Sequence, residues 1–359
     1  MISRKKTRPI KAGDLIIGGD APISIQSMTT FPIEDTDSTI AQIKNLQERG
    51  AQVIRIAVHS VNAAAHLKKI RAAVDAVLSA DIHFNHQIAI ESIKAGIDKV
   101  RINPGNIGSA AKVREVVAAA KDYGVPIRIG VNGGSIDRKK YADITSENLA
   151  ASALDHVRIL EDNDFYEIIV SIKSSDIFQT IEANKIFSEL RNYPLHIGLT
   201  EAGYGLDCIV WSTTLISCLL LNGIGDTIRV SMTGDPLEEV SIAQAILEAV
   251  GERQPFIRII SCPTCGRTDP ELDILALANE AKTAAIRHFE QKLKDGAKSV
   301  TIAVMGCEVN GPGEASEADF GLAGARGGHL LLFSKGREMK KIHKNEAINE
   351  LISGIEKII

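Results

Sequence analysis

The chain contains few aromatic residues, few cysteines and no long apolar segment. Only 4% of its 359 residues are Phe, Trp or Tyr, which argues against a surface that stacks nucleic-acid bases. Its net charge of −4 also differs from the basic character of nucleic-acid-binding domains. No run of about 18 apolar residues is present, so we expect no membrane span. Five cysteines, an odd number, and no apolar export signal after the basic first residues predict a cytoplasmic protein without a disulfide framework.

Short β-rich runs alternate with longer segments whose apolar residues recur at helical spacing. Eight runs occur, at 23–28, 53–58, 80–84, 99–103, 126–131, 167–173, 195–201 and 227–232. The helical segments between them include 38–49, 62–77, 110–122, 147–163, 176–192, 206–222 and 235–250. This alternation predicts parallel strands joined by helical crossovers, and eight units favour a closed (β/α)8 TIM-type barrel. An open doubly wound sheet is the alternative, but the glycine fingerprint that normally follows its first strand does not follow Met28.

The pattern changes after Gly251. We therefore predict a barrel at 1–252 and a smaller α+β domain at 253–359. The smaller domain is expected to contain a long helix, a strand, two glycine-rich stretches around a short apolar run, and a last helix. Their predicted ranges are 271–294, 299–304, 306–313, 321–328, 329–333 and 345–358.

Basic side chains recur towards the carboxyl ends of the predicted strands, where a TIM-type barrel carries its functional residues. They occur on five strands, as Arg55, Arg101, Arg128, Lys173 and Arg229. Alternate strand residues point into a barrel, and converging cations repel one another unless an anion lies among them. A diphosphate would resolve this repulsion, because it carries several negative charges. The glycine-containing loops 103–108 and 132–135 would add backbone amides suited to phosphate oxygens.

The sequence leaves other interpretations of these residues open. The arginines also fit structural salt bridges with Asp81, Glu201 and Asp226. Lys173 alone also fits a Schiff-base lysine, as in barrel aldolases, and Glu201 fits a general acid beside an anion. Taken singly, His83 and His196 fit hydrogen-bonded core imidazoles better than functional groups.

Three cysteines in glycine- and proline-rich turns form a second candidate site. Cys262 and Cys265 form a CxxC motif, and Cys307 follows at a distance. A CxxC motif occurs in zinc, thiol-redox and iron–sulfur sites. No second CxxC completes a zinc site, and a thioredoxin-like motif has no distant third cysteine, so we favour a cubic iron–sulfur cluster with one unusual ligand. Glu308 and Glu314 are the nearby candidates for that ligand.

Cys208 and Cys218 lie in an apolar helical segment and are predicted to be core residues. Two further hypotheses keep the barrel without redox chemistry. One is a phosphate lyase that uses Lys173, with a structural zinc module. The other is a non-enzymatic protein whose second domain is a zinc-stabilised binding domain.

Ten short motifs together resemble the 4-hydroxy-3-methylbut-2-enyl diphosphate synthase family, the GcpE (IspG) enzymes of isoprenoid biosynthesis. They extend over essentially the whole chain, at 24–29, 53–58, 80–85, 100–108, 126–135, 171–176, 198–203, 226–236, 261–267 and 306–314. The pair CPTCGR and GCEVNGPGE is the most specific part of the resemblance.

The resemblance implies a two-electron reduction of 2-C-methyl-D-erythritol 2,4-cyclodiphosphate at a 4Fe-4S cluster. The ring opens, water is lost, and 4-hydroxy-3-methylbut-2-enyl diphosphate forms in the non-mevalonate pathway. Carried over by motif, Cys262, Cys265 and Cys307 bind three irons, and Glu314 binds the fourth as a more exchangeable ligand. Glu201 matches the proton donor to the leaving hydroxyl. The positions that match diphosphate-holding residues are Arg55, Arg101, Arg128, Asn132, Lys173, Arg229 and Ser231.

The resemblance also implies an assembly and a partner. The short interval between Met232 and Cys262 matches the bacterial two-domain form and lacks the large middle domain of the plant-type form. In the bacterial form the cluster domain of one subunit caps the barrel of the other, so we expect a homodimer with a shared active site. Flavodoxin or ferredoxin is the expected electron donor, and no nucleic-acid or membrane partner is expected.

Overall fold

The computed structural model describes residues 3–104, 106–134, 136–294, 298–309 and 311–358. Three residues of the predicted motifs, Gly105, Ser135 and Asn310, lie outside the described residues. The chain divides into two compact units, Met1–Arg253 and Gln254–Ile359. The predicted domain boundary lies one residue earlier, between 252 and 253.

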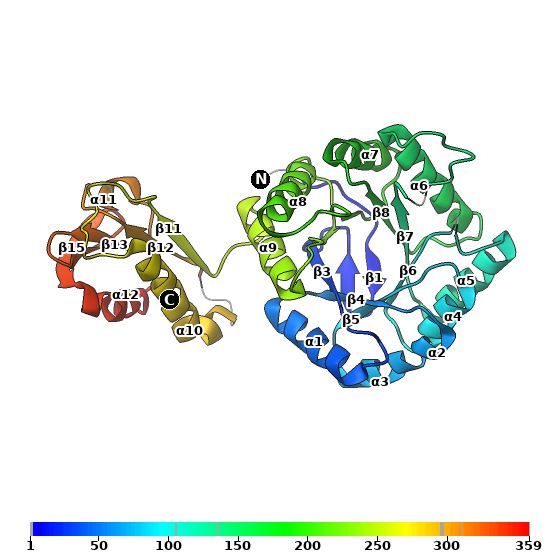
Figure 1. Cartoon of the computed structure of the whole chain (residues 1–359), viewed down its shortest axis with the longest axis horizontal. Coiled ribbons are helices and arrows are strands. Elements are labelled where there is room, and N and C mark those ends of the chain that lie inside the picture. Colours follow the sequence, from blue (N-terminus) through cyan, green and yellow to red (C-terminus); the bar gives the residue numbers. More distant parts are fainter. Residues whose placement is uncertain (1–2, 105, 135, 295–297, 310, 359) are drawn as a thin grey trace. The chain divides into compact units, whose positions relative to one another are not determined.

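Eight parallel strands form the centre of the first unit, in the order β8-β7-β6-β5-β4-β3-β10-β9 (Figure 1). A parallel bridge between Val170 and Leu195 joins β8 to the residue before β9, so the sheet closes into a barrel. The predicted TIM-type barrel is therefore confirmed. The strands are β3 (Ser24–Met28), β4 (Val53–Ala57), β5 (Val77–Asp81), β6 (Lys99–Ile102), β7 (Ile127–Asn132), β8 (Ile168–Lys173), β9 (His196–Ile197) and β10 (Thr227–Ile228).

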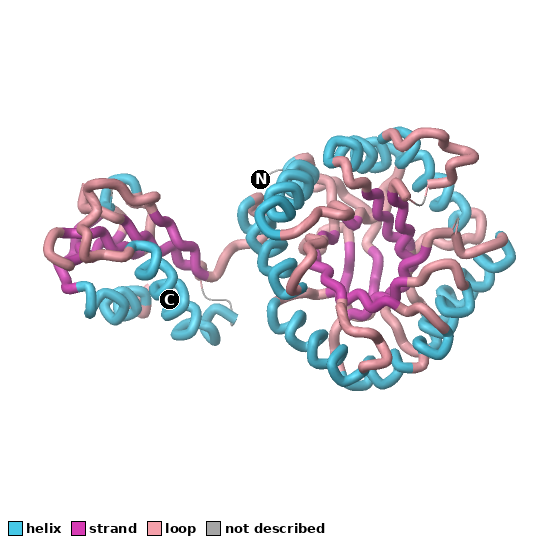
Figure 2. Tube along the Cα trace, viewed as in Figure 1, coloured by secondary structure: helices cyan, strands magenta, loops and turns pink. Residues whose placement is uncertain are grey.

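Helices surround the barrel, one or two after each strand (Figure 2). Several begin where a polar side chain accepts a hydrogen bond from an exposed backbone N–H, as Asp35 does from Ser38 and Asp176 from Gln179. Among the helices of the described residues, none is long and apolar enough to cross a membrane. The helices are α1 (Thr36–Arg49), α2 (Val61–Ala64), α3 (His66–Ala73), α4 (His86–Lys94), α5 (Ala110–Tyr123), α6 (Ser146–Glu161), α7 (Ile177–Leu190), α8 (Gly205–Leu221) and α9 (Pro236–Ala249).

An antiparallel hairpin, which the sequence pattern did not reveal, precedes the barrel. Its strands are β1 (Ile10–Ala12) and β2 (Leu15–Ile17). Their apolar side chains pack against Val77 and Ile169, which lie at the amino ends of β5 and β8. The hairpin therefore covers the amino end of the barrel and leaves the carboxyl ends of the strands free to form a site.

Several predicted ranges in the barrel are wrong, and β9 and β10 are much shorter than the predicted runs 195–201 and 227–232. Only residues 80 and 81 of the predicted run 80–84 lie in a strand, because β5 begins at Val77 and ends at Asp81, and Phe84 has a φ of 64°, which an extended strand does not allow. The predicted helix 62–77 is broken after Ala64 and ends at Ala73, because Val74 is extended and leads into β5. The helix α4 was not predicted.

The second unit is a five-stranded mixed sheet with helices. Its first three strands are parallel and the last two are antiparallel, in the order β11-β12-β13-β14-β15. The α+β fold class is therefore confirmed. The elements are β11 (Ile257–Ser261), α10 (Ile274–Lys294), β12 (Val300–Met305), α11 (Gly311–Glu314), β13 (Phe320–Ala325), β14 (His329–Ser334), β15 (Arg337–His343), a 3-10 turn (Lys344–Glu346) and α12 (Ala347–Ile355).

The two faces of this sheet have different roles. On one face α10 and α12 bury an apolar core that includes Phe289, Ile302 and Leu351. On the other face a smaller core includes Met305 and Phe333, and Cys262 packs against it. The second face therefore carries the cysteine turns.

Candidate active site

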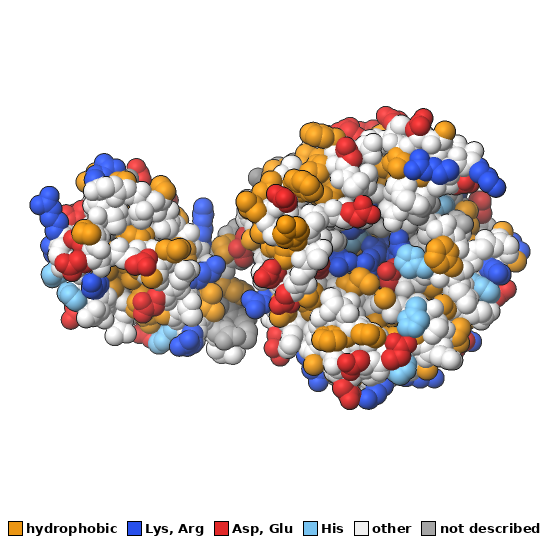
Figure 3. Space-filling view, viewed as in Figure 1, with side chains coloured by type: hydrophobic (Ala, Val, Ile, Leu, Met, Phe, Trp, Pro, Cys, Tyr) orange, Lys and Arg blue, Asp and Glu red, His pale blue; other side chains and the backbone are white. Residues whose placement is uncertain are grey.

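A cavity of about 220 Å³ opens at the carboxyl ends of the barrel strands. Blue Lys and Arg side chains are visible in the hollow at the centre of the barrel (Figure 3). All seven residues predicted to hold a diphosphate line this cavity. The lining residues are Arg55, Asp81, His83, Arg101, Arg128, Gly130, Val131, Asn132, Ser171, Lys173, Thr200, Arg229 and Ser231.

Strand register explains why residues so far apart in sequence meet. Asp81 pairs with Arg101 across β5 and β6, and Arg101 pairs with Arg128 across β6 and β7. Closer to the carboxyl end of β7, Asn132 pairs with Lys173 of β8. Parallel strands end at the same edge of a barrel, so their last inward residues form one surface.

Asp81 is the central carboxylate of the cavity. Its oxygens lie 3.2 Å from Arg101 Nη1, 3.8 Å from Arg55 Nε and 3.6 Å from His83 Nε2. Burial alone would raise the pKa of Asp81. The positive charge of Arg55 and the hydrogen bond from His83 outweigh burial, so the pKa of Asp81 lies well below its ordinary value. The salt-bridge interpretation is therefore correct for Arg55 and Arg101, whose charges Asp81 neutralises in part.

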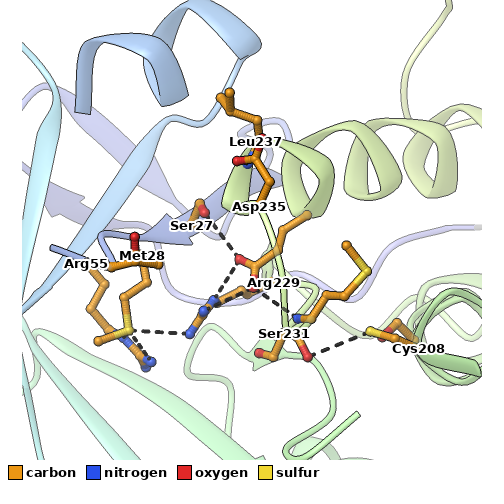
Figure 4. A network of polar contacts seen from close by, with 12 residues as sticks. Ser27, Met28, Arg55, Cys208, Arg229, Ser231, Asp235 and Leu237 are labelled. Atoms are coloured by element: carbon orange, nitrogen blue, oxygen red, sulfur yellow. Dashed lines mark hydrogen bonds and ion pairs between the residues drawn. The ribbon is translucent and has the colours of Figure 1, made fainter. Parts of the chain in front are cut away.

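Arg229 pairs with a carboxylate that the sequence did not single out. Its Nη2 lies 3.3 Å from Oε1 of Glu239, a buried residue on α9. The thioether sulfur of Met28 accepts hydrogen bonds from Arg55 Nη2 at 2.9 Å and from Arg229 Nη1 at 3.6 Å (Figure 4). Two guanidinium groups thus share one uncharged acceptor, and Asp226, the partner suggested by sequence, instead accepts from Thr7.

The cavity carries more positive than negative charge. In the part of the chain that the structure describes, no carboxylate lies within ion-pair distance of Arg128 or Lys173, although both are buried. Burial, followed by the positive charges of Arg128 and Arg229, holds the pKa of Lys173 well below its ordinary value. Five basic groups line the cavity, whereas their carboxylate partners are only Asp81 in the wall and Glu239 behind it, so the cavity is suited to a multiply charged anion.

Glu201 lies beside the cavity. Thr200 lines the cavity, and Glu201 follows it as an exposed residue with a φ of 57°. Phe84 in the 80–85 motif and Thr264 between the CxxC cysteines also have positive φ, at 64° and 63°. Such strain in residues other than glycine is typical of functional sites, because the surrounding structure must maintain it.

The two histidines differ from the interpretation as hydrogen-bonded core residues. The side chain of His83 is 54% exposed and lies 3.1 Å from Arg101 Nη1, so it is a cavity residue and the core interpretation is wrong. His196 is fully buried, as predicted for a core residue. Neither of its ring nitrogens has a hydrogen-bond partner among the described residues.

In the second unit, the carboxyl ends of adjacent parallel strands bring the cysteine turns together. Ser261 of β11 pairs with Val304 of β12, so Cys262 and Cys307 follow neighbouring strand ends. The backbone N–H of Gly306 donates a hydrogen bond of 3.1 Å to Cys262 Sγ. N–H groups directed at sulfur are typical of sites where cysteine acts as a thiolate.

Arg267 connects the remaining predicted ligands. A hydrogen bond with Cys265, followed by the negative charges of Cys265, Cys307 and Glu314, raises the pKa of Arg267. Hydrogen bonds from the backbone and side chain of Arg267 in turn lower the pKa of Cys265, which favours its thiolate. Glu308, the other candidate ligand, is exposed and lines a groove with Cys307 and Arg267.

This donor set fits an iron–sulfur cluster. It combines three sulfurs, a carboxylate, a backbone N–H directed at sulfur and a nearby guanidinium that offsets thiolate charge.

All five cysteines are free thiols. Cys208 is fully buried in the barrel core, and Cys218 is half-buried against it. The prediction of core positions is therefore confirmed for Cys208 and holds in part for Cys218.

A parallel barrel with a cavity lined by basic side chains, joined to a smaller unit with cysteine turns, places the chain in the class of two-domain barrel proteins. The GcpE TIM-barrel domain model matches residues 7–244, and the GcpE protein C-terminal domain model matches residues 258–357. The chain belongs to the GcpE family, so the resemblance found in the sequence is confirmed.

Relatives extend over the whole chain. A 4-hydroxy-3-methylbut-2-en-1-yl diphosphate synthase (flavodoxin) of Clostridium perfringens is 47% identical over 360 residues, which are 99% of this chain and 100% of the relative. The enzyme of the same name from Geobacillus thermodenitrificans is 46% identical over 361 residues, or 100% of this chain and 94% of the relative. The chain is thus an oxidoreductase of this family.

Among solved structures, the barrel is similar to dihydropteroate synthases. The Yersinia pestis enzyme matches with a TM-score of 0.50 and 13% identity over 68% of this chain and 98% of its own. Its complex with a sulfonamide drug matches with a TM-score of 0.51 and 12% identity, over 68% of this chain and 100% of its own. At this identity the similarity concerns the fold alone.

Proposed function

We propose that the chain converts 2-C-methyl-D-erythritol 2,4-cyclodiphosphate to 4-hydroxy-3-methylbut-2-enyl diphosphate in the non-mevalonate isoprenoid pathway. The reaction is a two-electron reduction that takes up protons, opens the ring and releases water. Family membership over the full chain supports the choice of product, which the relatives' names contain. The observation that carries the proposal is the cavity itself, in which five basic side chains converge on a space that suits a diphosphate.

In this proposal the barrel binds the diphosphate. Arg128 and Lys173 have no carboxylate partner among the described residues, so their charges are available to phosphate oxygens. The other contacts come from Arg55, Arg101, Asn132, Arg229 and Ser231, all of which line the cavity. Glu201 is the proton donor to the leaving hydroxyl, and its exposed position next to Thr200 allows it to exchange protons with solvent.

The second unit would hold a 4Fe-4S cluster through Cys262, Cys265, Cys307 and Glu314. When bound, the cluster supplies electrons singly to the substrate. The chain's own residues tune this site. Arg267 stabilises the thiolate of Cys265, and the Gly306 N–H withdraws charge from the sulfur of Cys262.

A flavodoxin is the proposed electron donor, because the relatives' names contain it, and ferredoxin is the alternative. We place the activity in the cytoplasm, where reducing conditions keep cysteine ligands as thiols. The proposed assembly is a homodimer in which each barrel is completed by the cluster domain of the other subunit.

Anaerobic purification and reconstitution test the proposal. The wild-type chain should be brown, contain about four irons and four sulfides per chain, and consume the cyclic diphosphate with a chemical reductant. Cys307→Ser should lose iron, sulfide and activity, whereas Cys208→Ser, a buried thiol outside the second unit, should keep the cluster. Colourless wild-type protein with one zinc per chain would instead support the zinc-module hypotheses.

A further inference from the structure

A buried carboxylate behind the cavity wall contacts Arg229 and the residue that follows Ser231. Glu239 lies in α9, the helix that follows β10, and is only 4% exposed. It does not line the cavity. The start of α9 is fixed by Pro236 in its first turn and by Asp235, whose side chain accepts from the N–H of Leu237 at 2.9 Å. Glu239 is therefore carried by a well-defined helix start.

Each oxygen of the Glu239 carboxylate accepts two hydrogen bonds. Oε2 accepts from Ser27 Oγ at 3.2 Å and from Arg229 Nε at 3.4 Å. Oε1 accepts from Arg229 Nη2 at 3.3 Å and from the backbone N–H of Met232 at 3.0 Å. One carboxylate thus joins β3 to two residues that follow β10, Arg229 and Met232.

These contacts fix Ser231 as well as Arg229. Ser231 lies between Arg229 and Met232 in sequence, so anchoring those two neighbours restrains its backbone. The carbonyl of Ser231 also accepts a 3.7 Å contact from Cys208 Sγ on α8. Met28, on the opposite side, accepts from Arg229 Nη1, so the guanidinium is held from two directions.

We propose that Glu239 is a positioning residue for the anion site: it sets Arg229 and Ser231 in the geometry that binds a diphosphate. The role rests on the proposed function, because the diphosphate is taken to be part of the substrate. A simple counterion is the alternative. The two ideas predict opposite effects when the charge is removed. Without its counterion, the cavity becomes more positive and binds an anion equally well or more tightly, whereas loss of positioning weakens binding.

Glu239→Gln separates the two ideas, because glutamine has nearly the same shape. All four partners of Glu239 are donors, so the NH2 group of glutamine must face at least one of them and displace it. Inorganic diphosphate binding, measured by calorimetry on the full chain, should weaken about tenfold. In turnover, KM should rise by a similar factor and kcat should change by less than about threefold.

Two further variants make the result specific. Glu238→Gln, the exposed neighbouring residue on the same helix, should bind diphosphate as the wild type does. Ser27→Ala removes one donor to Glu239 without changing charge, and should weaken binding about twofold. The double variant Ser27→Ala, Glu239→Gln should bind no more weakly than Glu239→Gln alone, because Ser27 acts only through Glu239. If Glu239→Gln unfolds, Ser27→Ala still tests the positioning role, because the role requires weaker diphosphate binding and a higher KM in that variant.

Unchanged or tighter diphosphate binding by a folded Glu239→Gln variant overturns the positioning role. Additive losses in the double variant overturn it as well. Failure of the wild-type chain to bind diphosphate at all overturns the proposed function of the cavity, and the positioning role with it. These failures are distinguishable because only the last concerns the unmodified protein.

Discussion

Gly130 lies directly beneath the guanidinium of Arg101. A Cβ added to Gly130 would lie 2.4 Å from Arg101 Nε and 2.7 Å from Arg101 Nη2, far closer than van der Waals contact. Arg101 in turn donates to Asp81 and lines the anion cavity. The missing side chain on β7 therefore makes room for a charged side chain from β6, a relationship that the motif around residues 126–135 does not reveal by itself.

Gly130→Ala should displace Arg101 from the cavity. The added methyl group meets only the flexible end of a side chain, so the barrel should fold while the anion site loses one contact. Loss of a charge-assisted contact costs about 1.5–3 kcal/mol, so diphosphate affinity should fall at least tenfold. Calorimetry with inorganic diphosphate measures the affinity of the variant and of the wild type.

The matched comparison is a double-mutant cycle with Arg101→Ala. If Gly130 acts only through Arg101, adding Gly130→Ala to Arg101→Ala should change the affinity no further. An additional loss in the double variant would mean that the methyl group disturbs another part of the cavity.

Lys173 gives the anion site a dependence on pH. Burial and nearby cations hold its pKa well below the ordinary value of 10.5, so a rise in pH removes its proton in the free protein. Binding of an anion then requires proton uptake, and the affinity of the wild type should fall by up to about tenfold per pH unit above that pKa. Lys173→Met should bind about tenfold or more weakly near neutral pH.

The test is the ratio of the two affinities, in which the titration of diphosphate itself cancels. The wild-type advantage should shrink as the pH rises above the lowered pKa of Lys173 in the free protein. A constant ratio across this range would mean that Lys173 does not change its protonation when the anion binds, and would overturn the proposed pH dependence.

The sequence contained enough information for the barrel and for its cationic cavity. Inward-facing strand positions alternate, so basic residues near the ends of five predicted strands specify the same surface from several directions. This is why the sequence predicts that Arg55 and Arg229, 174 positions apart (229 − 55), lie together, and both line the cavity. Errors of a few residues in the strand bounds did not matter, because the strand directions were right.

What the sequence did not reveal depends on contacts between elements. Glu239 looks like any acidic residue near a helix start, and only the packing of α9 against β3 brings it to Ser27. The stretch 321–328 was predicted as a glycine-rich stretch, but 320–325 form the buried strand β13. A Cβ on Gly321 would lie 2.1 Å from the ring of Phe333, so this glycine serves close packing of neighbouring strands. The charged strand β15 was missed because its side chains are mostly exposed.

Glu314→Ala tests the predicted fourth cluster ligand. Glu314 is exposed, and its charge acts on Arg267 together with the charges of Cys265 and Cys307. The three cysteines should still retain iron and sulfide, with up to one iron per cluster lost, because thiolates hold the other irons. Turnover should fall at least about a hundredfold. Iron and sulfide analysis, with an anaerobic activity assay, measures both effects.

Glu308→Ala is the matched control for this prediction, because Glu308 is also exposed and lies next to Cys307. Full turnover in Glu314→Ala together with lost turnover in Glu308→Ala would mean that Glu308, and not Glu314, is the fourth cluster ligand. Unchanged turnover in both variants would exclude a carboxylate as the fourth ligand.

Lys99 is fully buried inside the barrel and should destabilise it. Its Nζ donates to Gln26 Oε1 at 3.1 Å, and no carboxylate of the described residues lies within ion-pair distance. Burial, followed by the positive charges of Arg128 and Arg55, holds its pKa well below 10.5. Replacement by methionine, which has a similar length and no charge, should raise the free energy of unfolding by about 1–4 kcal/mol.

The sign of the pH dependence follows from proton linkage. Between the lowered pKa of Lys99 in the folded chain and 10.5 in the unfolded chain, the unfolded state binds more protons, so the stability of the wild type rises with pH. The advantage of Lys99→Met should therefore be largest below this interval and decrease as the pH approaches 10.5. Lys44→Met, at an exposed position of α1, should change the free energy of unfolding by less than about 0.5 kcal/mol across this pH range. Urea unfolding followed by circular dichroism measures each difference.

A Lys99→Met variant that is less stable than the wild type near neutral pH would contradict this prediction. It would mean that the surroundings of Lys99 stabilise its ammonium group as a charged group inside the barrel.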